Sequence, residues 1–589
     1  MSRTAPSSGA APSTGADVGL VAFLGAAGVG ALLWAGGAAS ALVSGHRVPK
    51  GRYLAGFEAL GHLGSPSAAW GASVGPAPLY WALTLVAFAL AVIAGFGAVK
   101  VWHSLGVGEV SDPARAPGTA TRSEVRRAAG DRALLARSAT LRRSLPRPRP
   151  ADVGYRLGSA RGLSCWASVE DSVLVLGPPR SGKGLHLVVP MVLDAPGAVV
   201  TTSTRPDNLA ITLQARSGRG PVMVFDPQGL AGPPAHAPVL HWSLTRGCEA
   251  GQVAMARAEA LVPSAGSAGV ENSNFWRAQA LSATRCLLHA AALDARPPAD
   301  LYRWSHSAGL AKEAVAVLSS STGAAPGWGE ALDAIVSADQ RTRDSVWAMV
   351  ANTFAPLADP AVLAALSPGP GGELDPLAFL AMGGSVYLLG TAAGASACAT
   401  FVAALVEDLA DAARRLAARS PGQRLDPPLA LVLDEAANYP LPSLPSLMSE
   451  GGGSGITTVA VLQSLSQARD RWGREAAQAI WDAAIVKVIL GGSANADDLA
   501  DISRLLGDHE VREWSETRHG GPSGSSLTSS VRRRAVLEPA ELRRLRFGTA
   551  LLLLRSAAPV VMTLRPWTAR ADAARLGAAR RAWEERERA

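Results

Sequence analysis

A glycine-rich loop is the first stretch of this sequence that could do chemistry. Residues 174–186 read LVLGPPRSGKGLH, in which two glycines five residues apart precede a lysine. Such glycines let backbone N–H groups turn toward a phosphate, and the lysine ammonium neutralises the β- and γ-phosphates of a nucleotide. The predicted nucleotide-binding residues are therefore Gly177, Pro178, Pro179, Arg180, Ser181, Gly182, Lys183, Gly184 and Leu185.

The loop departs from the usual pattern at one position, because Gly184 stands where a serine or threonine hydroxyl would hold magnesium. A working site with an altered metal shell, an inactive site and a chance match are all open on the loop alone. Strand-like residues before the loop and helix-like residues after it supply the context that a phosphate-binding loop needs. Lys183 is also one of only five lysines in a chain with 51 arginines, which argues against chance.

An acidic pair could complete the site. The stretch LVLDEAAN places Asp434 and Glu435 at the end of an apolar strand, where ligands bind in open α/β sheets. We expect this strand to lie next to the strand of the loop, with Asp434 as the Mg²⁺ ligand and Glu435 polarising the attacking water. The acidic turn alone is a weak signal, but together with the loop it predicts hydrolysis of ATP or GTP. Gln463 ends the next apolar run and is either a γ-phosphate sensor or an ordinary polar strand end.

The elements that must position these residues are short apolar runs between helical stretches. Continuous apolar strands alternating with helices predict a mostly parallel sheet covered on both faces. Residues 548–564 predict an edge hairpin, 250–375 read as helices alone, and the Gly/Ser stretch 519–530 predicts a loop. The predicted strands lie within 172–177, 197–204, 221–227, 384–391, 429–435, 456–463 and 484–492.

Two stretches without charge, 18–43 and 75–99, are each long enough to cross the roughly 30 Å hydrocarbon core of a bilayer as a helix. Buried core helices, or a signal peptide for the first stretch, are the alternatives. Ten arginines lie within 115–149, so the positive-inside rule predicts that both termini are cytoplasmic. We therefore expect a multi-pass anchor in the plasma (inner) membrane, with helices over about 18–43 and 76–99. The arginine stretch is either a solvated collar or a contact for DNA or lipid phosphate.

Composition limits the class of protein further. A chain of 589 residues predicts several domains, and 48% apolar residues with a mean hydropathy of +0.16 agree with membrane segments. The formal charge of +8 suits DNA or an anionic membrane and does not decide between them. The four cysteines are far apart in the sequence and form no CxxC pair. Their spacing argues against a disulfide framework or zinc site and fits a reducing compartment.

Several motifs carry a resemblance to a known family through their order and spacing: GPPRSGKG, TTSTRPDNL, VFDPQG, NFWRAQAL, VLDEAANYPLPSLPSLMSEGGGSGI, VLQSLSQARDRWG and SRLLGDHEV. From about residue 165 to 567 the chain resembles the type IV secretion coupling proteins, the conjugative TraG/TraD group. The resemblance implies an α/β fold with a RecA-like P-loop ATPase core of the FtsK/HerA superfamily, in which glycine commonly follows the loop lysine. It also implies catalytic roles for Lys183, Glu435 and Gln463 and a metal-binding role for Asp434.

The resemblance further implies a ring of six subunits that uses ATP and Mg²⁺ to move DNA, bound independently of sequence, together with its relaxase. Relaxosome proteins and components of the secretion channel would be the partners. Three alternatives share the motifs or part of them: a chromosomal DNA translocase of the FtsK/HerA kind, a membrane-tethered adaptor for DNA or relaxase with little turnover, and an exporter of protein alone. The helical insertion would either meet DNA or relaxase or be a plain solvated surface, since its arginines are scattered in the sequence: Arg277, Arg285, Arg296 and Arg303.

One departure from the family concerns catalysis. Gly452 and Ser454 stand where many relatives carry arginines, one of which is thought to reach the γ-phosphate of the neighbouring subunit. Either an arginine at 469, 471 or 474 replaces it, or hydrolysis is slow.

The expected organisation begins with a membrane anchor over 1–110 and a basic cytoplasmic linker over 111–165. A P-loop ATPase domain follows in two parts, 166–250 and 376–567, separated by the all-α insertion over 251–375. The chain ends in a charged tail over 568–589.

Overall fold

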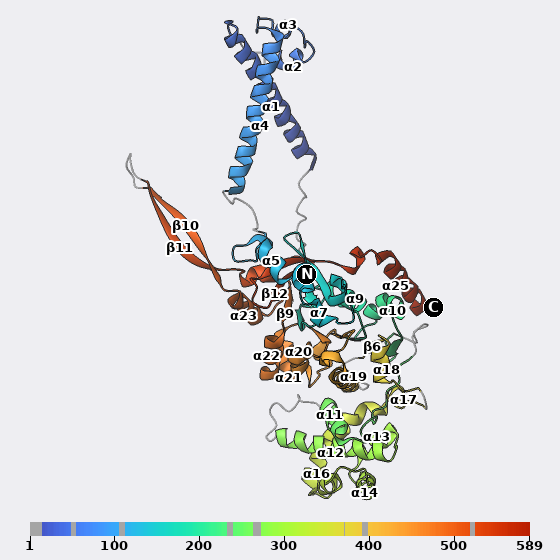
Figure 1. Cartoon of the computed structure of the whole chain (residues 1–589). Coiled ribbons are helices and arrows are strands. Elements are labelled where there is room, and N and C mark those ends of the chain that lie inside the picture. Colours follow the sequence, from blue (N-terminus) through green and yellow to red (C-terminus); the bar gives the residue numbers. More distant parts are fainter. Residues whose placement is uncertain are drawn as a thin grey trace, which may run out of the picture. The chain divides into compact units, whose positions relative to one another are not determined.

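The structure of the chain is a computed structural model that describes residues 14–48, 55–104, 112–231, 239–262, 273–369, 372–390, 398–518 and 525–588. It divides into two compact units, Met1–Val110 and Ser111–Ala589 (Figure 1). All the residues predicted to do chemistry belong to the second unit.

The first unit is a pair of long helices, α1 (Thr14–Val43) and α4 (Ala77–Ser104), joined through the short helices α2 (Ala55–Ala59) and α3 (Ser67–Trp70). The two long helices approach closely at Gly36, where an added Cβ would lie 2.1 Å from Thr84 Oγ1. Small residues permit such close approach in pairs of membrane helices. The glycine-rich part of the first apolar stretch therefore serves helix–helix packing.

Among the described residues, one helical segment, Ala77–Gly97 of α4, is long and apolar enough to cross a membrane. The apolar segment of α1, Ala27–Val43, is shorter than that length. Apolar side chains of α4 are exposed over much of its length, as a lipid-facing surface would require: Leu85, Val86, Phe88, Leu90, Val92, Ile93 and Phe96. The two-helix anchor therefore stays a prediction, and the length and exposed apolar side chains of α4 support one of its two helices.

The second unit is built on an eleven-stranded sheet with the order β2-β1-β13-β12-β9-β3-β8-β7-β4-β6-β5. The seven strands from β9 to β5 are parallel, and the four on the other side of β9 are antiparallel. The predicted α/β class with a mostly parallel sheet is confirmed. The hairpin within 548–564 is present as β12 and β13, but its predicted place at an edge is wrong, because β13 also pairs with β1 and β1 with β2. The bounds are β3 (Val173–Leu176), β4 (Val199–Ser203), β5 (Val222–Phe225), β6 (Ser385–Leu389), β7 (Leu429–Leu433), β8 (Ile456–Leu462), β9 (Val486–Leu490), β12 (Thr549–Leu554) and β13 (Val560–Leu564).

The strand order corrects one prediction. The acidic strand β7 does not lie next to the loop strand β3, because β8 pairs in parallel with both. The register places Leu462 opposite Leu176 and Ala460 opposite Leu433. Each of these strands is buried along its whole length, so no alternation in the sequence specifies its neighbours. As a consequence, Gln463 follows a strand that runs between the loop strand and the acidic strand.

The stretch 111–165, expected as a linker, is folded into the second unit. Its helices are α5 (Arg122–Ala128), α6 (Asp131–Leu135), α7 (Ser138–Leu141) and α8 (Pro150–Val153), and its strands β1 (Gly154–Ala160) and β2 (Leu163–Ser168) form the antiparallel edge of the sheet. Val125, Leu141 and Tyr155 are buried in the same core as the central strands. Part of the arginine collar makes intramolecular pairs, since Arg137 contacts Glu170 and Arg142 Nε donates to Asp426 Oδ1 at 2.6 Å.

Helices cover the sheet. Near the loop lie the π-helical turn η2 (Gly184–Val188), α9 (Val189–Asp194), α10 (Asp207–Ser217) and the C-terminal α25 (Ala573–Arg588). The other helices of this part are α18 (Pro376–Ala381), α19 (Ala399–Arg419), α20 (Leu444–Glu450), α21 (Leu465–Trp472), α22 (Arg474–Ala483), α23 (Ala496–Leu506) and α24 (Pro539–Arg543).

A separate two-stranded ribbon, β10 (Asp508–Arg518) and β11 (Ser525–Ala535), projects from the second unit (Figure 1). The loop predicted for 519–530 is therefore shorter than expected, because residues 525–530 pair with β10. Residues 519–524 lie outside the described part of the chain. The reason for the difference lies in the sequence of β11, SSLTSSVRRRA, whose serines and threonines resemble a loop and show no regular apolar alternation.

Within the described residues from 251 to 369 the chain forms only helices, as predicted. They are α11 (Gly251–Leu261), α12 (Ser273–Leu293), α13 (Pro298–His306), α14 (Lys312–Ser320), α15 (Trp328–Val336), α16 (Gln340–Phe354) and α17 (Pro360–Ala365). The four scattered arginines each have a local partner. Arg277, Arg296 and Arg303 pair with carboxylates, and Arg285 lies over the ring of Trp328.

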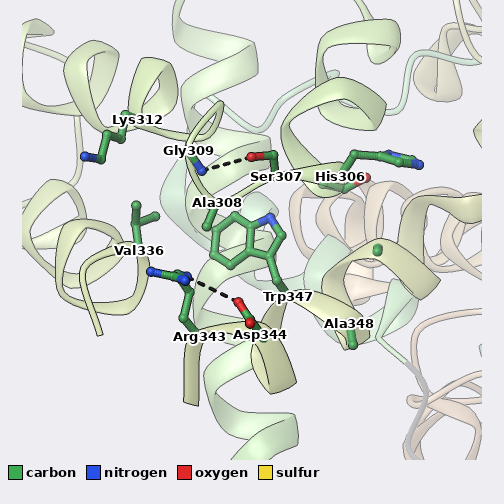
Figure 2. A pocket seen from close by; sticks show the side chains of 12 residues that line it. His306, Ser307, Ala308, Gly309, Lys312, Val336, Arg343, Asp344, Trp347 and Ala348 are labelled. Atoms are coloured by element: carbon green, nitrogen blue, oxygen red, sulfur yellow. Dashed lines mark hydrogen bonds and ion pairs between the residues drawn. The ribbon is translucent and has the colours of Figure 1, made fainter. Parts of the chain in front are cut away.

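The helical region also contains a cavity of about 580 Å³ lined by residues of α13, α14, α15 and α16 and the turn after α13 (Figure 2). The ring of Trp347 lies at its centre, with Lys312 on one side and Arg343, paired with Asp344, below (Figure 2). It has neither a glycine-rich loop nor a strand end with an acidic pair. Its chemistry therefore differs from that of the nucleotide site described next.

Candidate nucleotide-binding site

A second cavity of about 580 Å³ lies where the loop, the acidic pair and Gln463 meet. Its lining includes Lys183, Asp434, Glu435 and Gln463, so the structure brings the four key predicted residues together. Six of the nine predicted loop residues line it as well: Pro179, Arg180, Gly182, Lys183, Gly184 and Leu185. The other three shape the loop, since Ser181 Oγ donates to the carbonyl of Pro178 at 2.7 Å and Gly177 precedes it at the strand end.

The loop has the backbone that a phosphate cradle needs. Gly182 has φ +88, and an added Cβ there would lie 2.7 Å from His186 Nδ1, so both conformation and space require glycine. Lys183 Nζ donates to the carbonyls of Gly177 at 2.7 Å and Pro178 at 2.9 Å, so the ammonium is held inside the loop. Burial lowers the pKa of Lys183, and the nearby carboxylates of the acidic pair oppose that shift.

Asp434 is a half-buried carboxyl that lines the cavity. Burial raises its pKa to about 6, and the neighbouring Glu435 adds to the rise, while a hydrogen bond from Asn208 and the charge of Lys183 oppose it. Asn208 Nδ2 donates to Asp434 Oδ2 at 3.2 Å and orients the carboxylate. A half-buried anionic oxygen of this kind is stabilised by a cation, which fits a ligand for Mg²⁺.

The described residues contain no group of three or more His, Cys, Asp or Glu side chains that could hold a metal ion by themselves. A Mg²⁺ ion at this site would therefore bind Asp434 and take its remaining ligands from water and nucleotide phosphates. Magnesium keeps several waters readily, so such a shell is chemically reasonable. A shell of this composition would not need a hydroxyl at position 184, where the loop has glycine.

Glu435 is held by two hydrogen bonds. Its carboxylate oxygen Oε2 accepts from Thr204 Oγ1 at 2.6 Å and from Asn438 Nδ2 at 2.9 Å. Its backbone has φ +51, a left-handed conformation that is uncommon outside glycine and is often found at functional sites. The side chain is thus fixed at the cavity wall, in a suitable place for a carboxylate that polarises water.

The Thr204 contact gives a testable expectation. In Thr204→Val, Glu435 loses one of its two positioning hydrogen bonds, and we expect kcat for ATP hydrolysis to fall about tenfold with KM unchanged. Steady-state kinetics of the full-length protein measure both constants. Thr140→Val, at an exposed position on α7, is the matched control and should behave as wild type. A change in KM alone would assign Thr204 to nucleotide binding instead.

Sequence reasoning missed several residues of this site. Thr204 and Asn208 follow β4, and they reach the acidic pair because β4 is the neighbour of β7. Both lie in the motif TTSTRPDNL, to which no role in the site was assigned, and the strand order shows why that motif reaches the acidic pair. Trp567, at the end of the predicted ATPase domain, and Arg580, from the segment expected to be a charged tail, also line the cavity.

At one of the two positions where relatives carry arginines, the structure leaves no room for a side chain. An added Cβ at Gly452 would lie 2.0 Å from the carbonyl oxygen of Glu170, so no side chain fits at this position. Of the suggested substitutes, Arg469 pairs with the buried Asp498 at 3.2 Å. Neither it nor Arg471 or Arg474 is among the described residues that line the cavity.

Comparison with known proteins adds two findings. Residues 428–547, from β7 to just before β12, match the family model described as the TraM recognition site of TraD and TraG. No curated protein matches the chain at a significant level.

The second finding concerns solved structures. The chain is 19% identical to the bacterial conjugative coupling protein TrwBΔN70 in its unbound monoclinic form, over 72% of this chain and 91% of that chain, with a TM-score of 0.51. The trigonal form in complex with sulphate is 19% identical over 73% of this chain and 92% of that chain, with a TM-score of 0.52. TrwB in complex with ADP and Mg²⁺ is 19% identical over 72% of this chain and 91% of that chain, with a TM-score of 0.50. At this identity the likeness shows a shared fold.

Proposed function

We propose that this chain is a type IV coupling protein of the TraG/TraD group and acts as a membrane-anchored ATP-driven motor. The family match over residues 428–547 and the fold shared with TrwB support this proposal. The motor delivers DNA with its bound relaxase to a type IV secretion channel. The observation that carries the proposal is the single cavity in which Lys183, Asp434, Glu435 and Gln463 meet. TrwB has been solved in complex with ADP and Mg²⁺ and in complex with a non-hydrolysable ATP analogue.

The chemistry follows from the positions of these side chains. The loop's backbone N–H groups and Lys183 hold the phosphates of ATP, and Glu435 accepts a proton from the water that attacks the γ-phosphorus. Gln463, between loop and acidic pair in the strand order, contacts the γ-phosphate and reports its loss. Asp434 would hold Mg²⁺, which would neutralise charge on the phosphate oxygens.

The remaining features of the proposal concern assembly and partners. Helices α1 and α4 anchor the chain in the plasma membrane with both termini in the cytoplasm, and six copies form a ring. The domain match to the TraM recognition site supports a relaxosome protein as partner. DNA is bound through its phosphates, so binding is independent of sequence and weakens with salt.

A membrane-tethered adaptor with little ATPase activity is the second candidate. The observation that favours it is that no side chain fits at Gly452, so this chain cannot carry an arginine where many relatives have one. A trans arginine is worth about 10³–10⁵ in rate in related phosphoryl-transfer enzymes, so its loss without a substitute would leave slow turnover.

The test is ATP hydrolysis by the full-length protein in detergent, with and without single-stranded DNA. We expect hydrolysis that DNA stimulates and that is absent in a Lys183→Ala, Glu435→Gln double variant. Turnover equal to that of the double variant would leave the adaptor as the better description. Turnover well above it, but without any response to DNA, would argue against DNA as the transported substrate.

A further inference from the structure

The C-terminal helix α25 is docked on the ATPase core beside α10, as Figure 1 shows. Arg570, just before the helix, pairs with Asp194 at the end of α9 at 2.7 Å. Leu576 on the first turn is fully buried, and Trp583 near the end is 8% exposed. These contacts fix α25 at both ends, so the residues between them keep a defined position.

The cavity lining divides into two sets by chemistry. One set holds Lys183, Asp434 and Glu435, which carry the charge expected around a triphosphate. The other set is an apolar cluster of three buried side chains, Val189, Ile211 and Trp567. Leu185 packs against this cluster, and all four residues line the cavity. Arg580 is the residue of α25 at this wall.

The succession of residues along the phosphate-binding loop indicates which end of a nucleotide each of the two sets would contact. The β- and γ-phosphates lie at Lys183, and the α-phosphate lies at the N–H groups that follow it. Ribose and base then continue past Leu185, toward the apolar set. Ligand sites of this kind are lined by apolar and aromatic side chains with a few placed polar groups.

We propose that Arg580 and Trp567 form the subsite for the purine base, so that the C-terminal helix is part of the nucleotide site. This inference rests on the proposed function and names the residues that bind the base. A guanidinium stacks on a flat aromatic ring, which a lysine ammonium does less well. Arg580 Nε donates to Glu584 Oε1 at 2.7 Å, an i,i+4 pair on a half-exposed surface. Such a pair is weak enough to yield when a base is bound.

The experiment compares two probes on the full-length protein: ATP, which has a base, and inorganic tripolyphosphate, which has none. We expect Arg580→Ala to weaken ATP binding about tenfold and to leave tripolyphosphate binding unchanged. Arg580→Lys, which keeps the charge without the planar group, should resemble Arg580→Ala. Arg581→Ala, an exposed neighbour on the same helix that does not line the cavity, is the matched control and should bind both probes as wild type.

Each outcome bears on one proposal. Equal loss for both probes would place Arg580 at the phosphates, and no loss for either would place it outside the site; both results overturn the base subsite. By contrast, wild-type protein that binds neither probe, or Lys183→Ala that binds tripolyphosphate as tightly as wild type, would overturn the nucleotide site itself.

Discussion

Glu435→Gln is expected to abolish ATP turnover while nucleotide binding is retained. The amide keeps the shape of the side chain and can still contact Thr204 and Asn438, which hold the carboxylate in the native protein. It cannot accept a proton from the attacking water. Loss of a general base costs about 10²–10⁴ in rate. Steady-state hydrolysis measures the first effect, and equilibrium binding of a non-hydrolysable ATP analogue measures the second.

Glu450→Gln is the matched control for this variant, because Glu450 is an exposed carboxylate at the end of α20. It should hydrolyse ATP as wild type does. If Glu435→Gln also retained wild-type turnover, the water would be activated elsewhere and Glu435 would have only a structural role. Loss of analogue binding together with turnover would show that Glu435 supports the nucleotide cavity itself.

Lys183→Ala is expected to remove conjugative transfer to the level of a strain without the protein. The ammonium lies inside the loop, bonded to two of its carbonyls, and no other lysine lines the cavity among the described residues. Removal of one preorganised charged donor at a phosphoryl site costs about 10²–10³ in rate. Mating frequency between donor and recipient strains is the measurement, with the amount of protein in the membrane checked by immunoblot.

Two further variants sharpen that experiment. Lys183→Arg should also fail, because the planar guanidinium does not fit where a compact ammonium reaches into a glycine loop. Arg126→Ala removes an exposed cation on α5 and should transfer at the wild-type level. Wild-type transfer by Lys183→Ala would remove the motor role, whatever the hydrolysis rate of the purified protein.

Much of the fold could be predicted from the sequence, because its signals are local. Parallel strands inside the sheet, such as Val173–Leu176 and Ile456–Leu462, are buried on both faces and therefore appear in the sequence as largely apolar runs. The hairpin of β12 and β13 and the all-α region follow from the same kind of pattern. Strands β1 and β2 were missed, because both are partly exposed and β1 contains Gly154 and Gly158.

The candidate site divides in the same way. The loop, the acidic pair and Gln463 were predicted from residue type, spacing and position after strands, and the cavity contains all of them. Thr204, Asn208 and Arg580 were not assigned, since each is an ordinary polar residue in its own segment. Their significance arises from contacts with Glu435, Asp434 and the cavity that join segments far apart in the chain.

The sequence by itself therefore determined the chemistry: a glycine turn with Lys183, two carboxylates at a strand end and a mostly parallel sheet to carry them. Tertiary structure alone decided that β8 runs between the two halves of the site and that the C-terminal helix forms one of its walls. The reason is physical. Strand order and helix docking depend on long-range packing between apolar surfaces that look alike in sequence, whereas turns and strand ends are set by the residues within them.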